Sequence, residues 1–187
     1  MKIQAAMRLQ SQALDEQLID DSTGKLKIKQ LAPNLKYSSA KHMGTVDGLD
    51  LYQIPDGIDR ALVLRDVKKV IGYFVLRPVK FMHGYTNFPA ACMVAYELFL
   101  LKPYRGRKLA SSLFEEAMKI TKHLVSDTAI ALGAAKAFMS LAKHGHKIKL
   151  IDMITNKQVP YTIGADGLPE VDGKSMQSYT QDFVFYI

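Results

Sequence analysis

The segment Ala90–Leu101 constrains the fold of this sequence most, because apolar residues occupy both of its alternating faces. A strand of this kind must be covered on two sides, so we expect it to lie centrally in a sheet. Only Glu97 interrupts the run. The basic turn Lys102–Lys108 follows at once, and apolar residues at helical spacing then predict an amphipathic helix from Arg107 to about Lys122. A basic, glycine-containing turn at the start of a helix is a suitable place to hold phosphate.

Apolar runs on either side of this unit predict further strands and one further helix. Ala61–Asp66 and Val70–Phe81 read as an antiparallel hairpin, because a short charged turn joins two apolar segments. Leu124–Val125 reads as a small buried strand. The other expected elements are a second helix from a cap at Ser126, Asp127 or Thr128 to Gly145, last strands at Lys147–Ile154 and Asp182–Ile187, and a glycine-rich turn or loop at Ile163–Gly173.

The sequence before the hairpin has a weaker pattern. The first twenty residues show loose helical spacing, which predicts a surface helix that ends at Asp20–Gly24. Lys25–Lys29 alternates like an edge strand with lysines on its solvent face, and Pro33–Gly48 reads as loop. We expect one domain over residues 1–187, in which residues 1–48 are an N-terminal extension of helix and loop.

Composition limits the class of protein and the kind of partner. The 187 residues are 48% hydrophobic and 23% charged, and no stretch supplies the roughly 18 consecutive apolar residues of a membrane span. Neither a secretory signal nor an internal disulfide is expected, since Cys92 is the single cysteine, so we expect a cytosolic protein. The net charge of +7 favours an anionic partner. Nucleic acid is the less favoured choice, because the basic residues are scattered and no nucleic-acid-binding motif is present.

The run Arg105-Gly-Arg-Lys-Leu-Ala110, between an apolar strand and a helix, resembles the turn of the GNAT superfamily of acyl-CoA-dependent N-acyltransferases. The order of elements over Leu62–Ile154 is similar to that family as well. Lys108 stands where the family has a glycine. The resemblance implies an α/β (α+β) fold with a mixed, mostly antiparallel, twisted central sheet flanked by helices. A weaker likeness, over Leu124–Asp127 and the segments after it, is to acetyltransferase-like proteins encoded by bacteriophages and their hosts.

The resemblance also implies a cosubstrate, acetyl-CoA, and the residues that would bind it. The backbone of the central strand would contact pantetheine, and the turn with the start of the helix would hold the pyrophosphate on successive N–H groups. Lys108 has two readings, because its ammonium would either contact a phosphate or occupy the space that the cosubstrate needs. The residues implied are Leu98, Phe99, Leu100 and Leu101 for pantetheine, and Arg105, Gly106, Arg107, Lys108, Leu109, Ala110 and Ser111 for pyrophosphate.

Glu97 is the candidate base that would take a proton from the attacking amine, since a carboxylate inside an apolar strand should have a raised pKa. The alternative is that Glu97 forms an ion pair with a nearby Lys or Arg. Many family members have a tyrosine four residues before the glycine that ends the second helix, but here that position is Leu141. Tyr96, another tyrosine or water would therefore have to protonate the leaving thiolate, unless the chemistry has been lost.

Two functions from different classes follow from these patterns. The first is an N-acetyltransferase that acts on a primary amine of a small molecule or a protein. The second is a catalytically silent domain of the same fold that binds a protein partner or a second copy of itself, in a cytoplasm or, for a phage protein, in a virion. No metal is expected, because His144, His146 and Asp152 do not have the spacing of a recognised metal site.

Overall fold

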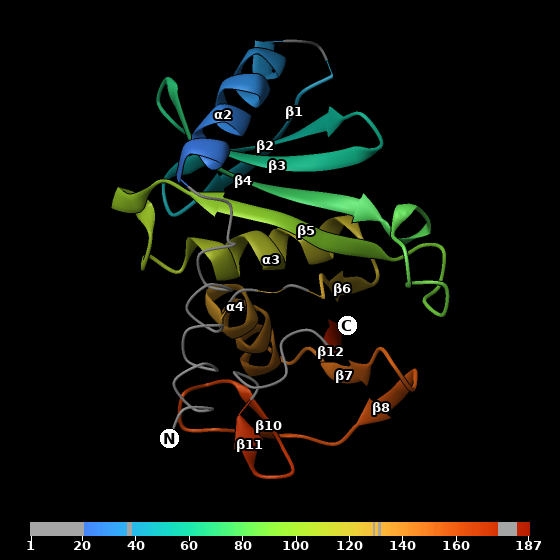
Figure 1. Cartoon of the computed structure of the whole chain (residues 1–187). Helices are drawn as coiled ribbons and strands as arrows, with labels where there is room; N and C mark the ends of the chain where they lie inside the picture. The colour runs from blue at the N-terminus through green and yellow to red at the C-terminus, as the bar shows by residue number, and fades with distance from the viewer. Residues whose placement is uncertain (1–20, 37–38, 129, 131, 176–182) are drawn as a thin grey trace.

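The computed structural model describes residues 21–36, 39–128, 130, 132–175 and 183–187, and shows a mixed α+β fold. Within these residues nine strands form one sheet in the order β1-β2-β3-β4-β5-β6-β12-β7-β8. All neighbouring strands are antiparallel except β5 and β6, which are parallel. Figure 1 shows helix α2 on one side of the sheet and helices α3 and α4 on the other. The predicted fold class, a mostly antiparallel mixed sheet flanked by helices, is confirmed.

The described helices and strands have the following bounds. The α-helices are α2 (Asp21–Leu31), α3 (Leu109–Ile120) and α4 (Leu132–Lys143), and the short 3₁₀ helices are η1 (Ala32–Lys36), η2 (Val79–Phe81) and η3 (Lys102–Tyr104). The strands of the large sheet are β1 (Lys41–Val46), β2 (Leu49–Asp56), β3 (Asp59–Asp66), β4 (Lys69–Pro78), β5 (Met93–Leu100), β6 (Leu124–Ser126), β7 (Lys149–Asp152), β8 (Lys157–Val159) and β12 (Phe183–Tyr186). A small separate sheet contains β9 (Thr162–Ile163), β10 (Pro169–Val171) and β11 (Lys174–Ser175).

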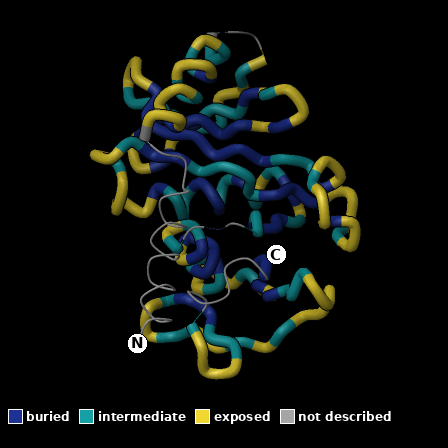
Figure 2. The backbone as a smooth tube through the Cα atoms, in the orientation of Figure 1, coloured by how far each residue is buried: buried dark blue, intermediate teal, exposed yellow. Residues whose placement is uncertain are grey.

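An aromatic core fills the space between the sheet and helices α3 and α4. Phe114 of α3 contacts Phe74 of β4 and Phe138 of α4, with ring centroids 4.7 and 5.0 Å apart. Phe138 stacks in turn on Phe185 of β12 at 5.2 Å. Because burying a large aromatic ring contributes roughly 2–3 kcal/mol, this chain of rings holds both helices to the sheet. Figure 2 shows the result as buried residues along the central strands, with exposed residues at the hairpin tips.

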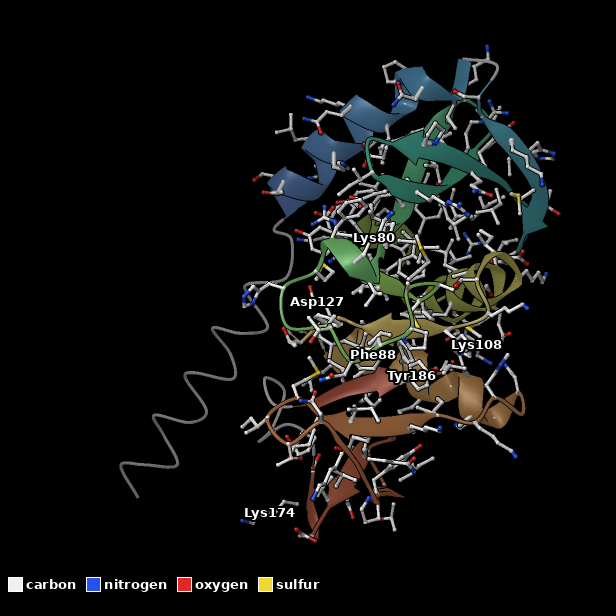
Figure 3. All side chains as sticks on the ribbon, turned by 90° about the vertical axis from the view of Figure 1, so that its right-hand side faces the viewer. Lys80, Phe88, Lys108, Asp127, Lys174 and Tyr186 are labelled. Atoms are coloured by element: carbon white, nitrogen blue, oxygen red, sulfur yellow. The ribbon has the colours of Figure 1, made fainter. Side chains whose placement is uncertain are left out.

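Two smaller apolar clusters cover the opposite face. Leu31 of α2 packs with Val63, Tyr73 and Phe99 of the sheet. Gly24 makes this contact close, since a Cβ atom there would lie 2.3 Å from the Phe99 ring. Further along the sheet, the segment after β4 packs over β6 and β12 through residues that include Tyr85 and Cys92. Figure 3 labels Phe88 of this segment and Tyr186 of β12, whose ring centroids are 5.6 Å apart.

The structure confirms the elements that were predicted from long apolar patterns. The hairpin is β3 and β4, the central strand is β5, the amphipathic helix is α3 and the short buried strand is β6. The second helix is α4, but its predicted caps are wrong. Ser126 ends β6, where its Oγ accepts the N–H of Phe185 at 2.9 Å, and α4 begins only at Leu132.

Three predictions about the flanking segments are also wrong. Lys25–Lys29 is part of helix α2 and not an edge strand, because its buried stripe runs through Gly24, Ile28 and Leu31 at helical spacing. Pro33–Gly48 is not loop throughout, since it contains edge strand β1. Ile163–Gly173 is not a turn or loop throughout, since it contains strand β10 and the last residue of β9. The predicted helix in the first twenty residues lies outside the described residues.

No helix in the described part of the chain is both long enough and apolar enough to cross a membrane.

Candidate functional site

Strand β5 has one edge that is only partly paired. Towards β4 it is paired along its whole length, whereas towards β6 its pairs end at Ala95, opposite Ser126. Just after the last β4–β5 pair, Leu101 donates its N–H to the carbonyl of Ile71 in β4. Because backbone groups alternate in direction along a strand, Leu98 and Leu100 direct their N–H and C=O groups to the other edge. This edge from Tyr96 to Leu100 has no strand partner among the described residues, and we call it the open edge.

The open edge leads directly into the basic turn and the start of α3. The turn needs two left-handed residues, Gly106 with φ 80° and Lys108 with φ 61°. Lys108 therefore has the backbone conformation that favours glycine, which is the residue that the family resemblance predicts there. No side chain caps the helix, so the N–H groups of Leu109, Ala110 and Ser111 point out of its first turn without an intrahelical acceptor. Such groups, with the helix dipole, attract an anion.

The arginines of the turn are held by neighbouring groups. Arg107 forms an ion pair of 2.7 Å with Asp47, which lies in the turn between β1 and β2. Arg105 donates from Nε to the carbonyl of Leu100 at 2.8 Å, and its guanidinium lies 5.5 Å from the centre of the Phe99 ring. Lys108 is exposed and is labelled in Figure 3.

A second side-chain contact, from Tyr104, connects the turn to the sheet. The hydroxyl of Tyr104 donates to Asp66 at 2.7 Å, and Asp66 ends strand β3. This hydrogen bond raises the pKa of Tyr104. The turn is therefore anchored to two hairpin tips through one carboxylate of each, which fixes its position relative to the end of β5.

Glu97 lies on the face of β5 that α2 covers. The register between β4 and β5 shifts there, because Val75 pairs with Glu97 while Leu76 pairs with Ala95. Tyr96 is the extra residue of this bulge. Burial raises the pKa of Glu97, and the positive charges of Lys27 and Arg77 oppose that effect without cancelling it. A raised pKa suits a group that must accept a proton near neutral pH.

Two ion pairs flank Glu97 from other elements. Lys27 of α2 binds Asp56 at the end of β2, and Arg77 of β4 binds Asp59 of β3 through two hydrogen bonds of 2.9 and 2.8 Å. Each of these cations is paired with its own aspartate, and neither forms an ion pair with Glu97 in the described structure. Glu97 therefore has a partly buried carboxyl, as the proposed base requires, and two cations nearby, as the ion-pair alternative requires. These cations lower its pKa by their charge without pairing with it.

Tyr96 and Tyr73 complete the surroundings of Glu97. The Arg77 guanidinium lies 3.6 Å from the centre of the Tyr96 ring, a cation–π contact that holds Tyr96 against the sheet. Tyr73 of β4 is fully buried, and its hydroxyl has no hydrogen-bond partner among the described residues. Burial raises the pKa of Tyr73, with the charge of Glu97 as the next cause.

Sequence analysis missed Lys27, Asp56, Asp59, Arg77 and Tyr73 as neighbours of Glu97. Strand pairing and α2 bring them together from four other elements. Part of this arrangement could be predicted from alternation along the strands. Tyr73 and Val75 are two residues apart and so share one face of their strand, as do Glu97 and Phe99. The register shift at Tyr96, which decides how the two strands align, carries no such signal.

Other residues considered in the sequence have structural surroundings. Leu141 is fully buried in the aromatic core, so no polar side chain takes the place of the tyrosine that the family often has there. His144 and His146 both contact the carboxylate of Glu115, at 2.6 and 3.1 Å. Among the described residues, no group of His, Cys, Asp and Glu is arranged to hold a metal. Cys92 is buried, which raises the pKa of its thiol.

Comparison with known proteins adds two distant likenesses. No model of a protein family matches this sequence, and no curated protein matches it. Among solved structures, an acetoin utilization protein from Exiguobacterium sibiricum matches 70% of this chain at 12% identity and a TM-score of 0.35, and the chain covers 61% of that protein, less than two thirds of its length. A GNAT family acetyltransferase from Elizabethkingia anophelis, solved with acetyl-CoA bound, matches 80% of this chain at 8% identity and a TM-score of 0.35, and 97% of that protein is covered. With TM-scores of 0.35, neither likeness carries an argument about this chain.

Proposed function

We propose that this protein is an N-acetyltransferase that binds acetyl-CoA and transfers its acetyl group to a primary amine. One observation carries the proposal: the open edge of β5 ends at the uncapped N-terminus of α3. Backbone groups without a strand partner and helix N–H groups thus follow one another along a single stretch of chain. Coenzyme A has a matching order of groups, since an amide-containing pantetheine arm is joined to a pyrophosphate.

The binding roles follow from the chemistry of each part. Leu98, and Leu100 through its N–H, would hydrogen-bond the amides of pantetheine through the open edge, as an added strand does, while the Leu100 carbonyl accepts from Arg105. The N–H groups of Leu109, Ala110 and Ser111 would bind the pyrophosphate, with the helix dipole adding to their attraction. Arg105 and Arg107 would supply positive charge, which for Arg107 means sharing its guanidinium between the phosphate and Asp47.

Glu97 would be the base of the reaction. An amine must lose a proton before or as its nitrogen attacks the thioester carbonyl, and the Glu97 carboxylate would take that proton. The carbon–sulfur bond then breaks, and the thiolate leaves with the electron pair of that bond. A backbone N–H of the open edge would donate to the developing oxyanion. Tyr96 remains the candidate acid for the thiolate, although a thiolate can also leave without one.

Calorimetric titration with acetyl-CoA tests the binding part of the proposal, with desulfo-CoA and ATP as comparison ligands. The double variant Arg105→Glu, Arg107→Glu places two carboxylates beside the pyrophosphate and should weaken binding about tenfold to a hundredfold. The matched control is Lys157→Glu with Lys174→Glu, which changes the net charge equally at two exposed positions in β8 and β11. Equal affinity in the two double variants would disprove the assignment of the turn.

A second candidate function is a silent binding domain, and one observation favours it. Leu141 is fully buried in the aromatic core, so α4 offers no proton donor at the position where the family often has one. Folded protein that fails to bind acetyl-CoA would select this function, and the search would then turn to protein partners. Binding without acetyl transfer to any of a panel of amines would place the loss at the chemical step.

A further inference from the structure

The buried hydroxyl of Tyr73 is the least explained polar group of the described structure. Tyr73 has 0% exposure, and its Oη has no hydrogen-bond partner among the described residues. In the same part of the chain, the other buried side-chain atom without a partner is Nε of Arg65, whose Nη2 still donates to Asp50 at 2.9 Å. Buried hydroxyls are rarely left unpaired in folded proteins, because desolvation without a hydrogen bond is unfavourable. A buried hydroxyl of this kind can pair with a neighbouring side chain that changes its rotamer.

The register of the sheet points to Glu97 as the partner, and among the carboxylates whose charge raises the pKa of Tyr73 the effect of Glu97 is larger than that of Asp56. Tyr73 pairs with Phe99, and Val75 pairs with Glu97. Tyr73 and Glu97 therefore lie on the same face of neighbouring strands in diagonal positions, and long side chains in such positions can reach each other. No other described residue brings a carboxyl group to this face from β5.

Two different surroundings are available to the Glu97 side chain. On one side are charged groups from four elements: Lys27 of α2, Asp56 of β2, Asp59 of β3 and Arg77 of β4. On the other side is the apolar cluster beneath α2, where the Tyr73 hydroxyl is the single polar group without a partner in the described structure. A carboxylate favours the first surroundings, because its charge is attracted by the cations. A protonated carboxyl favours the second, since it has no charge to desolvate and needs a hydrogen bond.

We propose that Tyr73 is a positioning residue, whose hydroxyl oxygen accepts the O–H of the Glu97 carboxyl after that carboxyl has taken the proton of the acceptor amine. The inference rests on the proposed role of Glu97 as base. Glu97 would turn from the cations towards Tyr73 when it is neutral and return when it loses the proton to solvent. Tyr73 would thereby stabilise the neutral form, so it would help the base to accept the proton and keep it away from the newly formed amide.

The test is a titration of the Glu97 carboxyl carbon by ¹³C NMR in the free protein. Tyr73→Phe keeps the ring and its stacking on Phe99 but removes the partner of the neutral carboxyl. The pKa of Glu97 should then fall by roughly half a unit to one unit, the value of one ordinary hydrogen bond. An unchanged or higher pKa in this variant would overturn the proposal.

Tyr85→Phe is the matched control. Tyr85 is also a buried tyrosine, but its hydroxyl already donates to the carbonyl of Ser126 at 3.1 Å. Its removal should lower stability and leave the Glu97 titration where it is in the wild type. A shift of equal size in both variants would mean that any lost buried hydroxyl disturbs Glu97, and would also overturn the proposal.

A measurement on the wild type keeps the test valid if Tyr73→Phe does not fold. The Cζ resonance of Tyr73 should move with the same midpoint as the Glu97 carboxyl, because the hydroxyl gains a partner as Glu97 becomes protonated. A Cζ resonance that stays constant through that midpoint would contradict the proposal. Neither titration requires acetyl-CoA, so their outcome is independent of the calorimetric test of the proposed function.

Discussion

Replacing Lys108 by glycine should stabilise the protein, because Lys108 has a left-handed backbone with φ 61° and ψ 9°. That conformation costs an L-residue roughly 1–2 kcal/mol. The extra freedom of glycine in the unfolded chain offsets about 0.4–1 kcal/mol of the relief. The net expectation is a free energy of unfolding higher by about 0.5–1 kcal/mol, or a Tm higher by about 1–4 °C for a domain of this size.

Urea unfolding followed by circular dichroism measures this difference. The control is Lys136→Gly, the same exchange at an exposed position inside α4, where glycine should cost roughly 0.5–1 kcal/mol. Lys108→Gly protein that is no more stable than the wild type would refute the claim that the turn stores backbone strain. Acetyl-CoA titration of the same variant decides between the two readings of Lys108: weaker binding means that its ammonium contacts phosphate, and tighter binding means that its side chain obstructs the turn.

Three further predictions concern the sheet and the turn. Gly72→Ala should destabilise the protein by about 1–3 kcal/mol in the same unfolding assay, because the new Cβ would lie 2.7 Å from the carbonyl oxygen of Phe99. The control is Gly133→Ala, which should not destabilise the protein, since a Cβ there would meet nothing within 4 Å. Asp47→Asn releases Arg107 and should tighten acetyl-CoA binding while changing stability by less than about 1 kcal/mol; unchanged affinity would mean that the ion pair does not compete with the ligand. Glu97→Gln should lower the rate of acetyl transfer more than the affinity for acetyl-CoA, and a rate equal to wild type across pH would remove Glu97 as the base.

The raised pKa of Glu97 also predicts how its stability contribution depends on pH. A carboxyl with a higher pKa in the folded than in the unfolded protein favours folding at low pH, and this contribution is lost as pH rises through the folded-state pKa. Glu97→Gln should therefore match the wild type in acid and exceed its stability at neutral pH. Unfolding curves at several pH values measure the difference, and a constant difference would contradict the burial of the charge.

The central unit of the fold could be predicted because its signals are local. Ala90–Leu101 is apolar on both faces, and the residues of α3 follow helical spacing over three turns. The prediction of a helix end at Asp20–Gly24 and an edge strand at Lys25–Lys29 was wrong for a physical reason. Gly24 reads as a terminator in sequence, but in the structure its missing side chain is what lets α2 approach Phe99. Strand β1 has little apolar character because it is an edge strand, with one buried residue, Val46.

The candidate site was predictable only along its own strand. Glu97 stands out as a carboxylate in an apolar run, and the basic turn stands out by composition. The groups that tune Glu97 come from strand pairing and helix docking, which a single sequence does not specify. Tyr73 pairs with Phe99 and Val75 pairs with Glu97 in one unbroken register, so alternation along the two strands places Glu97 and Tyr73 on the same face. The bulge at Tyr96 lies beyond these pairs and changes only how Leu76, Arg77 and Pro78 align with β5.

Strand β12 has a consequence for the order in which the protein folds. It lies between β6 and β7, so among the described strands the hairpin of β7 and β8 joins the rest of the sheet through β12 alone. Pairs such as Tyr186 with Val125 close a long loop, and contacts of large sequence separation form slowly. Until β12 is inserted, β6 presents an unpaired edge and the aromatic core lacks Phe185. Insertion of the four residues of β12 is therefore expected to be a late folding step. Once β12 is in place, strands β1–β6 and the β7–β8 hairpin belong to one sheet and are expected to unfold as one unit.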